Sequence, residues 1–166
     1  MTEPRRVEGT ITIEDARIIF KNFEGRESQY NRAGSKNFCV VLDEDMAGQL
    51  IRDGWTGVRQ LKERPDGTAG DWVMQVTVSY KNKPARVIMI TSKGRTELDE
   101  DTVDLLDDLD IKMADMIISP YNWNVRGETG VSAYLRKAFI TIEEDALDLK
   151  YAEVEDADDR PPFPTD

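Results

Sequence analysis

The stretch Met116–Ile142 constrains the fold more than any other part of the sequence. It contains two long segments of alternating apolar character joined by a glycine-bounded turn, Arg126–Gly130, which is typical of a β-hairpin. The apolar residues are odd-numbered in Val131–Leu135 but even-numbered in Ala138–Ile142. A β-bulge near Arg136-Lys137 explains this change of parity. The chain is therefore expected to contain a β-sheet built around this hairpin.

Side chains suited to nucleic acid share faces of this hairpin. With a period of two, Tyr121 and Trp123 lie on one face of the first strand, and Tyr134 and Arg136 on one face of the second. Non-specific binders of single strands stack bases on rings while cations follow the phosphates. We predict that the three rings stack on bases and that the arginine contacts phosphate. The alternative is that the rings belong to the core, where aromatic residues are often found.

The distribution of charge favours a local anion-binding surface. A formal net charge of −11 argues by itself against a phosphate ligand. The segment Trp72–Thr96, however, contains no acidic residue, whereas Glu97–Asp115 is strongly acidic. A basic window inside an acidic protein is the expected form of a local site, and its cations are Lys81, Lys83, Arg86, Lys93 and Arg95. The alternative is a solvated, lysine-rich surface.

A polar loop over Glu24–Lys36 adds three further candidates. It contains two glycines and reads as a flexible connection. A loop of this kind can close over a ligand, so we add Tyr30, Arg32 and Lys36 to the predicted DNA-binding residues. The alternative is a mobile connection without a role in binding.

The remaining segments predict short strands and two helices. Strands are expected within Val7–Phe23, with a bend at Glu14-Asp15, and over Asn37–Leu42, Trp55–Leu61, Trp72–Tyr80 and Arg86–Thr91. The last two of these strands are expected to form a second hairpin with a basic tip, with Trp72 and Tyr80 facing the core. One helix, Met46–Asp53, follows three carboxylates and ends at Gly54. The other is an amphipathic acidic helix from Asp99 to about Leu109.

Composition excludes several classes of protein. One cysteine, Cys39, rules out a disulfide framework and suits a reducing cytoplasm. No apolar stretch reaches the roughly 20 residues that span a bilayer, and the first residues lack a signal-peptide centre, so we expect a cytoplasmic protein without membrane contact. The chain has no histidine and no recognised enzyme motif. We therefore expect no catalytic residue, metal site or cofactor.

The last fifteen residues form an acidic, proline-rich tail that cannot fold alone. We expect a domain over residues 1–151 and a disordered tail over 152–166. The sequence Asp158-Asp159-Arg160-Pro161-Pro162-Phe163 is similar to the tip of bacterial OB-fold single-stranded DNA-binding proteins, which end in aspartates, prolines and a terminal phenylalanine. It departs from them because three residues follow Phe163. The resemblance implies that Asp158, Asp159 and Phe163 bind partner proteins.

The body of the chain resembles the single-stranded DNA-binding proteins encoded by bacteriophages of actinobacterial hosts. The resemblance rests on Phe38–Leu42 leading into Asp-Glu-Asp-Met, on the run that begins Met89-Ile-Thr-Ser-Lys-Gly-Arg, and on Pro120-Tyr-Asn-Trp. It implies a mainly β protein, an OB-fold-like antiparallel barrel or sheet with two short helices. It also implies a protein that coats exposed strands in phage DNA replication or recombination and recruits partners through its tail.

Two other functions remain compatible with the sequence. An acidic protein-interaction or DNA-mimic protein could use Asp99–Asp110 as its surface. A metal-dependent nuclease could use the same aspartates, although no acid pair is matched with a lysine in a recognisable spacing. The sequence does not determine the oligomeric state, and a homo-oligomer is compatible with it.

Overall fold

The computed structural model describes residues 7–29 and 31–144. The fold is mainly β, with nine strands and two helices in this part of the chain. In chain order the elements are β1 (Ile11–Ala16), β2 (Ile18–Asn22), β3 (Lys36–Leu42), α1 (Glu44–Asp53), β4 (Val58–Gln60), β5 (Trp72–Val78), β6 (Arg86–Thr91), β7 (Gly94–Leu98), η1 (Val103–Asp108), β8 (Ile111–Val125) and β9 (Glu128–Ile142).

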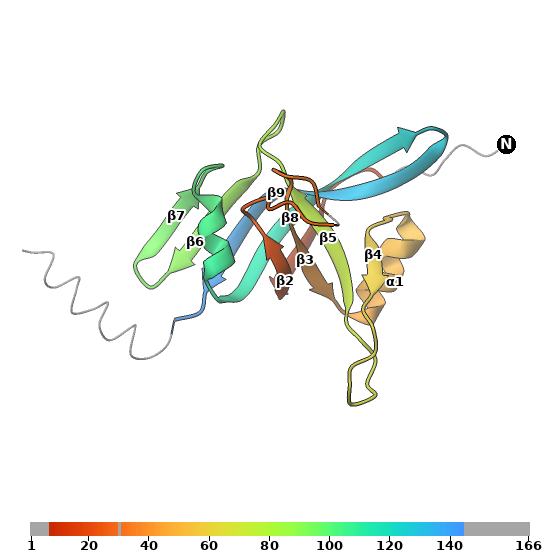
Figure 1. Ribbon diagram of the computed structural model, residues 1–166, viewed down its shortest axis with the longest axis horizontal. Helices are drawn as coiled ribbons and strands as arrows, with labels where there is room; N and C mark the ends of the chain where they lie inside the picture. The colour runs from red at the N-terminus through yellow and green to blue at the C-terminus, as the bar shows by residue number, and fades with distance from the viewer. Residues whose placement is uncertain (1–6, 30, 145–166) are drawn as a thin grey trace, which may run out of the picture.

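The predicted central hairpin is confirmed as β8 and β9, each 15 residues long. Its turn is tighter than the sequence suggested, because Val125 pairs with Glu128 and only Arg126 and Gly127 connect the strands. The predicted bulge is also confirmed. Ile117 pairs with Lys137 whereas the adjacent Ile118 pairs with Leu135, which leaves Arg136 as the extra residue. Figure 1 shows the turn end of this hairpin extending beyond the rest of the sheet.

The sheet is not purely antiparallel, so that part of the predicted fold class was wrong. Its strands follow the order β1-β8-β9-β5-β3-β2. β9 pairs in parallel with β5 at Ala133 and Tyr134, and in parallel with β6 from Lys137 to Thr141. The predicted hairpin of β5 with β6 was wrong for the same reason: both strands add, one after the other, to β9. β6 instead forms its hairpin with β7, a strand that the sequence reading missed.

The two ends of the strand order are consecutive in the chain. β1 and β2 are separated only by Arg17, and β1 pairs with β8 while β2 pairs with β3. The predicted bend is confirmed, because the register shifts between Ile13 and Ala16 and Asp15 has a φ of 53°. The Val41 N–H donates to the Arg17 carbonyl at 2.9 Å. The first strand, β1 followed by β2, therefore curls so that it pairs with β8 at one end of the strand order and with β3 at the other.

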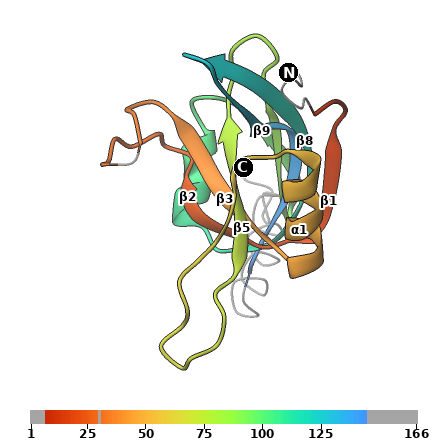
Figure 2. The same cartoon turned by 90° about the vertical axis from the view of Figure 1, so that its right-hand side faces the viewer.

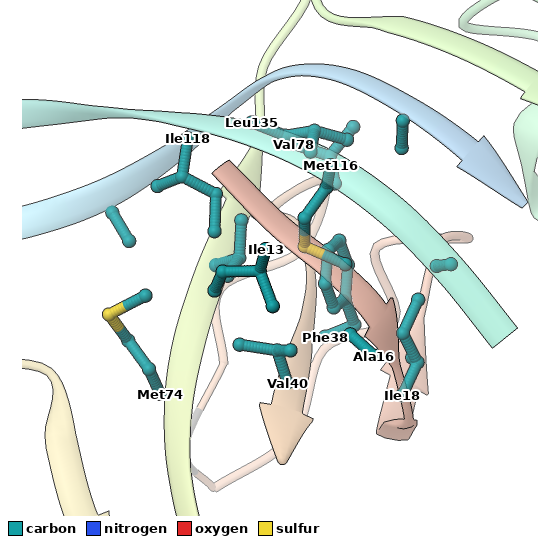
Figure 3. Close-up of a cluster of buried hydrophobic side chains, with 14 of the residues drawn as sticks. Ile13, Ala16, Ile18, Phe38, Val40, Met74, Val78, Met116, Ile118 and Leu135 are labelled. Atoms are coloured by element: carbon teal, nitrogen blue, oxygen red, sulfur yellow. The ribbon is translucent and has the colours of Figure 1, made fainter. Parts of the chain in front are cut away.

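One contiguous core fills the inside of this curled sheet (Figure 3). It takes alternate residues of each strand, as the period of two requires. The rings of Phe23 and Phe38 stack with centroids 5.4 Å apart. Side chains from six strands, β1, β2, β3, β5, β8 and β9, meet in the close-up, among them Ile13, Ile18, Phe38, Val40, Met74, Met116, Ile118 and Leu135. As predicted, Trp72 and Tyr80 pack against this core.

Cys39 is buried on the opposite face of β3 from Phe38 and Val40. Burial raises the pKa of its thiol, an effect that the neighbouring Arg59 guanidinium partly opposes. A raised pKa disfavours the reactive thiolate. The side chain therefore acts as a small packing residue.

The predicted helix α1 has the expected signals at both ends. The Asp43 carboxylate accepts a hydrogen bond from the Met46 N–H at 2.7 Å, and Gly54 ends the helix with a left-handed φ of 113°. The following strand is shorter than predicted, because only Val58–Gln60 of Trp55–Leu61 pairs, at the edge of β5. Figure 2 shows α1 on the outside of the sheet.

The acidic segment after β7 differs from the prediction, because η1 is a short 3₁₀-helix and not an amphipathic α-helix. At three residues per turn, Val103 and Leu106 share a face and are buried. An α-helix would place Leu105 on the apolar side with Val103, Leu106 and Leu109, as the amphipathic prediction implied, but Leu105 lies off the buried face and is 43% exposed.

The aspartates around η1 have structural partners. The Asp99 side chain accepts hydrogen bonds from the backbone N–H groups of Asp101 and Thr102. The Asp107 carboxylate accepts from the N–H groups of Phe23 and Glu24 at 2.8 and 2.9 Å, which ties η1 to the end of β2. Asp107 is therefore part of the packing, and not only of a solvated face as the sequence suggested.

Neither helix in the described residues is long and apolar enough to cross a lipid bilayer.

Candidate nucleic-acid interface

Two tyrosines, the exposed Tyr121 and the half-buried Tyr134, lie together on the outer face of the central hairpin. Tyr121 of β8 pairs with Ser132, and Tyr134 of β9 pairs with Ser119, so the two rings are diagonal neighbours on one face. Their centroids are 5.3 Å apart with an interplanar angle of 45°. Tyr121 is 55% exposed, whereas Ile118 and Leu135, on the other face of the same strands, are buried in the core. The period of two thus places the two tyrosine rings on the outer face of the strands and the apolar side chains that pack into the core on the inner face.

The bulge brings cations beside these rings. In a bulge of this kind, two residues of one strand oppose one residue of the other. Arg136 and Lys137 therefore both oppose Ile117, on the face that also carries Tyr134. Without the bulge, one of the two cations would point into the core.

The loop between β5 and β6 forms the opposite side of the site. It leaves β5 beside Tyr134 and returns to β9 opposite Lys137. Between the loop and the hairpin lies an open groove of about 500 Å³. Its lining consists of Ser79, Lys81, Asn82, Lys83, Ser119, Pro120, Tyr121, Tyr134, Leu135 and Arg136. The structure therefore brings together the predicted Lys81, Lys83, Tyr121, Tyr134 and Arg136.

A second hollow of about 450 Å³ continues the groove along β9. Lys83 and Arg136 line both hollows. The second is also lined by Thr10, Pro84, Arg86, Ile117 and Lys137. The two hollows form one path across the outer face of the sheet.

The cations of the groove differ in their partners from the four described arginines that form ion pairs. The ion pairs between described residues join Arg17 and Arg64 to Asp71, Arg26 to Glu24, and Arg86 to Glu97. Within residues 7–29 and 31–144, none of these pairs involves the four cations Lys81, Lys83, Arg136 and Lys137. Their charge is therefore uncompensated locally, although the chain as a whole is acidic.

Arg86 lies in the predicted basic window but is paired. Its Nη2 and Nε donate to one Glu97 oxygen at 2.6 and 3.1 Å across β6 and β7. The acid-free window ends one residue before Glu97, so counting charges along the sequence missed this partner. Arg86 lines the second hollow but shares its charge with a carboxylate.

The predicted cations Lys93 and Arg95 lie on the β6–β7 hairpin, away from the tyrosine pair along the molecule (Figure 1). The Arg95 guanidinium carbon lies 5.6 Å from the centroid of Phe139, and the Lys137 ammonium lies 5.0 Å from it. Sequence reasoning did not select Phe139. The signal was available, because Phe139 lies on the same face of β9 as Lys137.

Trp123 occupies a different environment from the tyrosines. Its indole covers Gly130, where an added Cβ would lie 2.2 Å from Cζ2 of the ring. Its Nε1–H donates to the Ser132 hydroxyl at 3.1 Å. The ring is partly buried and does not line the groove. The structure thus places Trp123 as a brace of the hairpin, and whether it also stacks on a base stays a prediction.

Of the predicted residues of the β2–β3 loop, Arg32 and Lys36 do not line the groove. The Lys36 ammonium donates to the Phe23 carbonyl at 2.9 Å, which anchors the loop. Arg32 is exposed within it, and Tyr30 lies outside the described residues. Lys36, where this loop enters β3, pairs with Val78, the last residue of β5 before the loop that forms one side of the groove. The predicted tail residues Asp158, Asp159 and Phe163 also lie outside the described residues.

Among the described residues, no three His, Cys, Asp or Glu side chains are grouped so that they could hold a metal ion.

The fold is similar to that of solved phage proteins. The single-stranded DNA-binding protein from bacteriophage Enc34 in complex with ssDNA matches with a TM-score of 0.56 at 11% identity, over 82% of this chain and 88% of that one. A C-terminal truncation of the same protein matches with a TM-score of 0.55 at 10% identity, over 82% and 87%. At these identities the likeness shows a shared fold.

A search of the curated proteins by sequence finds no match. The protein family described as "Putative phage ssDNA-binding domain" matches residues 1–161. This match spans most of the 166 residues, including every described element of the sheet. The chain therefore belongs to the phage ssDNA-binding domain family.

Proposed function

We propose that the groove on the outer face of β8 and β9 binds single-stranded DNA without preference for base sequence. The observation that carries this proposal is the Tyr121–Tyr134 pair on the outer face, beside cations that have no carboxylate partner among the described residues. Rings accept any base, because every base has a π-face, and cations bind the phosphates that all strands share. Stacking and phosphate contacts of this kind do not distinguish one base from another.

The geometry divides the work between the two sides of the groove. Tyr121 and Tyr134 project from the rigid hairpin, so stacking needs little ordering of the protein. Each stacked base contributes about 1–3 kcal/mol. Lys81 and Lys83 lie on the loop opposite, where long flexible side chains can follow a moving backbone. Each phosphate neutralised contributes about 0.7 to the magnitude of the logarithmic salt slope.

We further propose that the sheet is an OB-type barrel. Support comes from the strand order, in which the curled first strand, β1 with β2, contacts both β8 and β3. The parallel pairing of β5 with β9 fits the same topology. OB-folds bind oligonucleotides on the outer face of the sheet and through the adjoining loops. The groove occupies that kind of position.

The biological role we propose is non-catalytic. The protein coats exposed strands during phage DNA replication or recombination, in the host cytoplasm. The family match and the ssDNA complex of the Enc34 protein support single-stranded DNA as the ligand. The resemblance of the sequence to proteins of phages with actinobacterial hosts supports the source. The acidic tail, residues 152–166, recruits replication or recombination proteins through Asp158, Asp159 and Phe163.

Titration of a labelled oligothymidine at several salt concentrations tests the proposal. We expect binding whose affinity falls steeply with salt, and a loss of about ten- to a hundredfold for Tyr121→Ala or Tyr134→Ala. Phe20→Ala is the matched control, because Phe20 is an exposed ring outside the groove. Folded Tyr121→Ala and Tyr134→Ala proteins with unchanged affinity would refute the site. Shortening of the oligonucleotide in the presence of Mg²⁺ would favour the nuclease alternative.

A further inference from the structure

Two cations from different strands meet at one aromatic ring. Arg95 on β7 and Lys137 on β9 both lie within cation–π distance of Phe139, at 5.6 and 5.0 Å from the ring centroid. β6 lies between the two strands, and Ile88 of β6 pairs with Phe139. The ring therefore contacts two cations whose strands are not neighbours in the sheet.

The carboxylates nearest to this cluster are engaged elsewhere. Glu97 shares the face of Arg95, but its Oε1 accepts two hydrogen bonds from Arg86. Asp115 pairs with Phe139 across β8 and β9, and its Oδ1 accepts the Asp15 N–H at 2.8 Å. Among the described residues, neither Arg95 nor Lys137 forms an ion pair. Both cations contact the same ring and neither is held in an ion pair with a described residue, so both can bind an anionic ligand such as a phosphate.

The cluster lies at the end of the groove already described. On the outer face of β9, Tyr134 is followed by Arg136 and Lys137 at the bulge, and then by Phe139. The second hollow continues from the first as far as Lys137. Figure 1 shows β9 running from the projecting hairpin to the β6–β7 hairpin at the other end of the molecule. A ligand that fills both hollows therefore ends beside Phe139.

We infer that Arg95 and Lys137, held over Phe139, form a phosphate-binding site that extends the bound strand from the tyrosine pair to the β6–β7 hairpin. This inference rests on the proposed function and adds the path and extent of the DNA. At about 3.3 Å per residue, the five steps from Tyr134 to Phe139 span roughly 16 Å. An oligonucleotide too short to cover this distance cannot contact the rings and the cluster together.

A series of oligothymidines from about 4 to 16 nucleotides, the range of site sizes for one OB-fold, tests the inference. For the full-length wild-type chain, the salt slope should increase with oligonucleotide length up to a plateau. For Arg95→Ala/Lys137→Ala, the plateau should be lower by about 1.4, two phosphates at 0.7 each, and be reached at a shorter length. The shortest oligonucleotides that still bind at the tyrosine pair should show the wild-type slope.

Two further variants keep the test decisive. Arg95→Ala alone, on the edge strand β7, should lower the plateau by about 0.7 even if substitution of Lys137 in β9 impairs folding. Lys62→Ala removes an exposed cation from the β4–β5 loop and should leave the salt slope unchanged at every oligonucleotide length. A plateau equal to that of the wild type in Arg95→Ala overturns the inference. Failure of the proposed function is a different result, in which the wild type binds no oligonucleotide or Tyr121→Ala has no effect at any length.

Discussion

Two groups of cations in this protein differ in their partners. At the β4–β5 loop, Arg17 and Arg64 both donate to Asp71, at 2.8 and 2.6 Å. In the groove, Lys81, Lys83 and Arg136 form no ion pair with a described residue. The first region uses its cations to hold a loop in place. The second leaves them available to a ligand, so the availability of a cation matters more here than the number of cations.

Removing cations from each region should give the largest contrast. We expect Lys81→Ala/Lys83→Ala to reduce the magnitude of the salt slope for oligothymidine by about 1.4, because two phosphate contacts are lost. Arg17→Ala/Arg64→Ala removes the same formal charge and should leave the slope unchanged. Fluorescence anisotropy at several salt concentrations measures both. Equal losses in the two double variants would mean that net charge, and not the groove, governs binding.

Converting a paired cation into an available one should have the opposite and smaller effect. In Glu97→Gln, Arg86 loses its carboxylate partner beside the second hollow. We expect the salt slope to increase in magnitude by about 0.7. Glu24→Gln, which releases Arg26 from its partner in the β2–β3 region, is the matched control. An effect of the same size in both variants would show that the location of the released cation is irrelevant.

Removing the carboxylate of the structural region should affect stability only. In Asp71→Asn, both arginines lose an ion pair, and exposed pairs contribute about 0.2–1 kcal/mol each. We expect a small decrease in the free energy of unfolding, measured by urea denaturation, with the affinity for oligothymidine retained. A loss of affinity in the folded variant would mean that the β4–β5 loop takes part in binding.

The smallest effect concerns Tyr80, which joins the core to the groove loop. Burial, with the neighbouring charges of Asp99 and Glu100, raises the pKa of Tyr80 to about 12. Its hydroxyl is buried and has no hydrogen-bond partner among the residues that the structure describes. The folded pKa of Tyr80 lies above the unfolded value of about 10, so the folded protein keeps the phenol neutral at a pH where the unfolded chain loses its proton. The stability that depends on the neutral phenol is therefore complete below pH 10 and is lost as the pH rises toward 12.

Tyr80→Phe should therefore lessen the decrease in thermal stability between pH 10 and 12. Tyr121→Phe, which alters an exposed ring, is the control and should keep the wild-type profile. Identical alkaline profiles for the wild type and Tyr80→Phe would contradict a buried phenol.

Local patterns in the sequence predicted the local parts of this fold. The central hairpin, the bulge at Arg136, the bend near Asp15 and the caps of α1 all depend on residues close together in the chain. The pairing of β5 and β6 with β9 does not, because it joins segments more than fifty residues apart through backbone hydrogen bonds that any side chain permits. The two strands looked like a hairpin because each alternates well and a turn-like segment separates them.

The site was predictable to the same extent. Parity placed Tyr121 with Trp123 on one strand and Tyr134 with Arg136 on the other, and the acid-free window selected Lys81 and Lys83; the contact between the two tyrosines comes from the strand register. The pairing of Arg86 with Glu97 and the cluster at Phe139 depend on which strands become neighbours, which the alternation of apolar residues does not encode. η1 was read as an α-helix because four apolar residues in seven suit either helical period.

The late position of β9 in the chain has a consequence for how the protein folds during synthesis. β9 pairs with β8, β5 and β6, so three strands lack a partner along one edge until residue 142 has left the ribosome. Pairings such as Ile11 with Ile118 likewise wait for distant segments, and topologies rich in such contacts fold in milliseconds to seconds. During translation the exposed edges are open to pairing with other chains. β9, which lines the groove, is thus also the strand whose synthesis completes the sheet and ends the exposure of these edges.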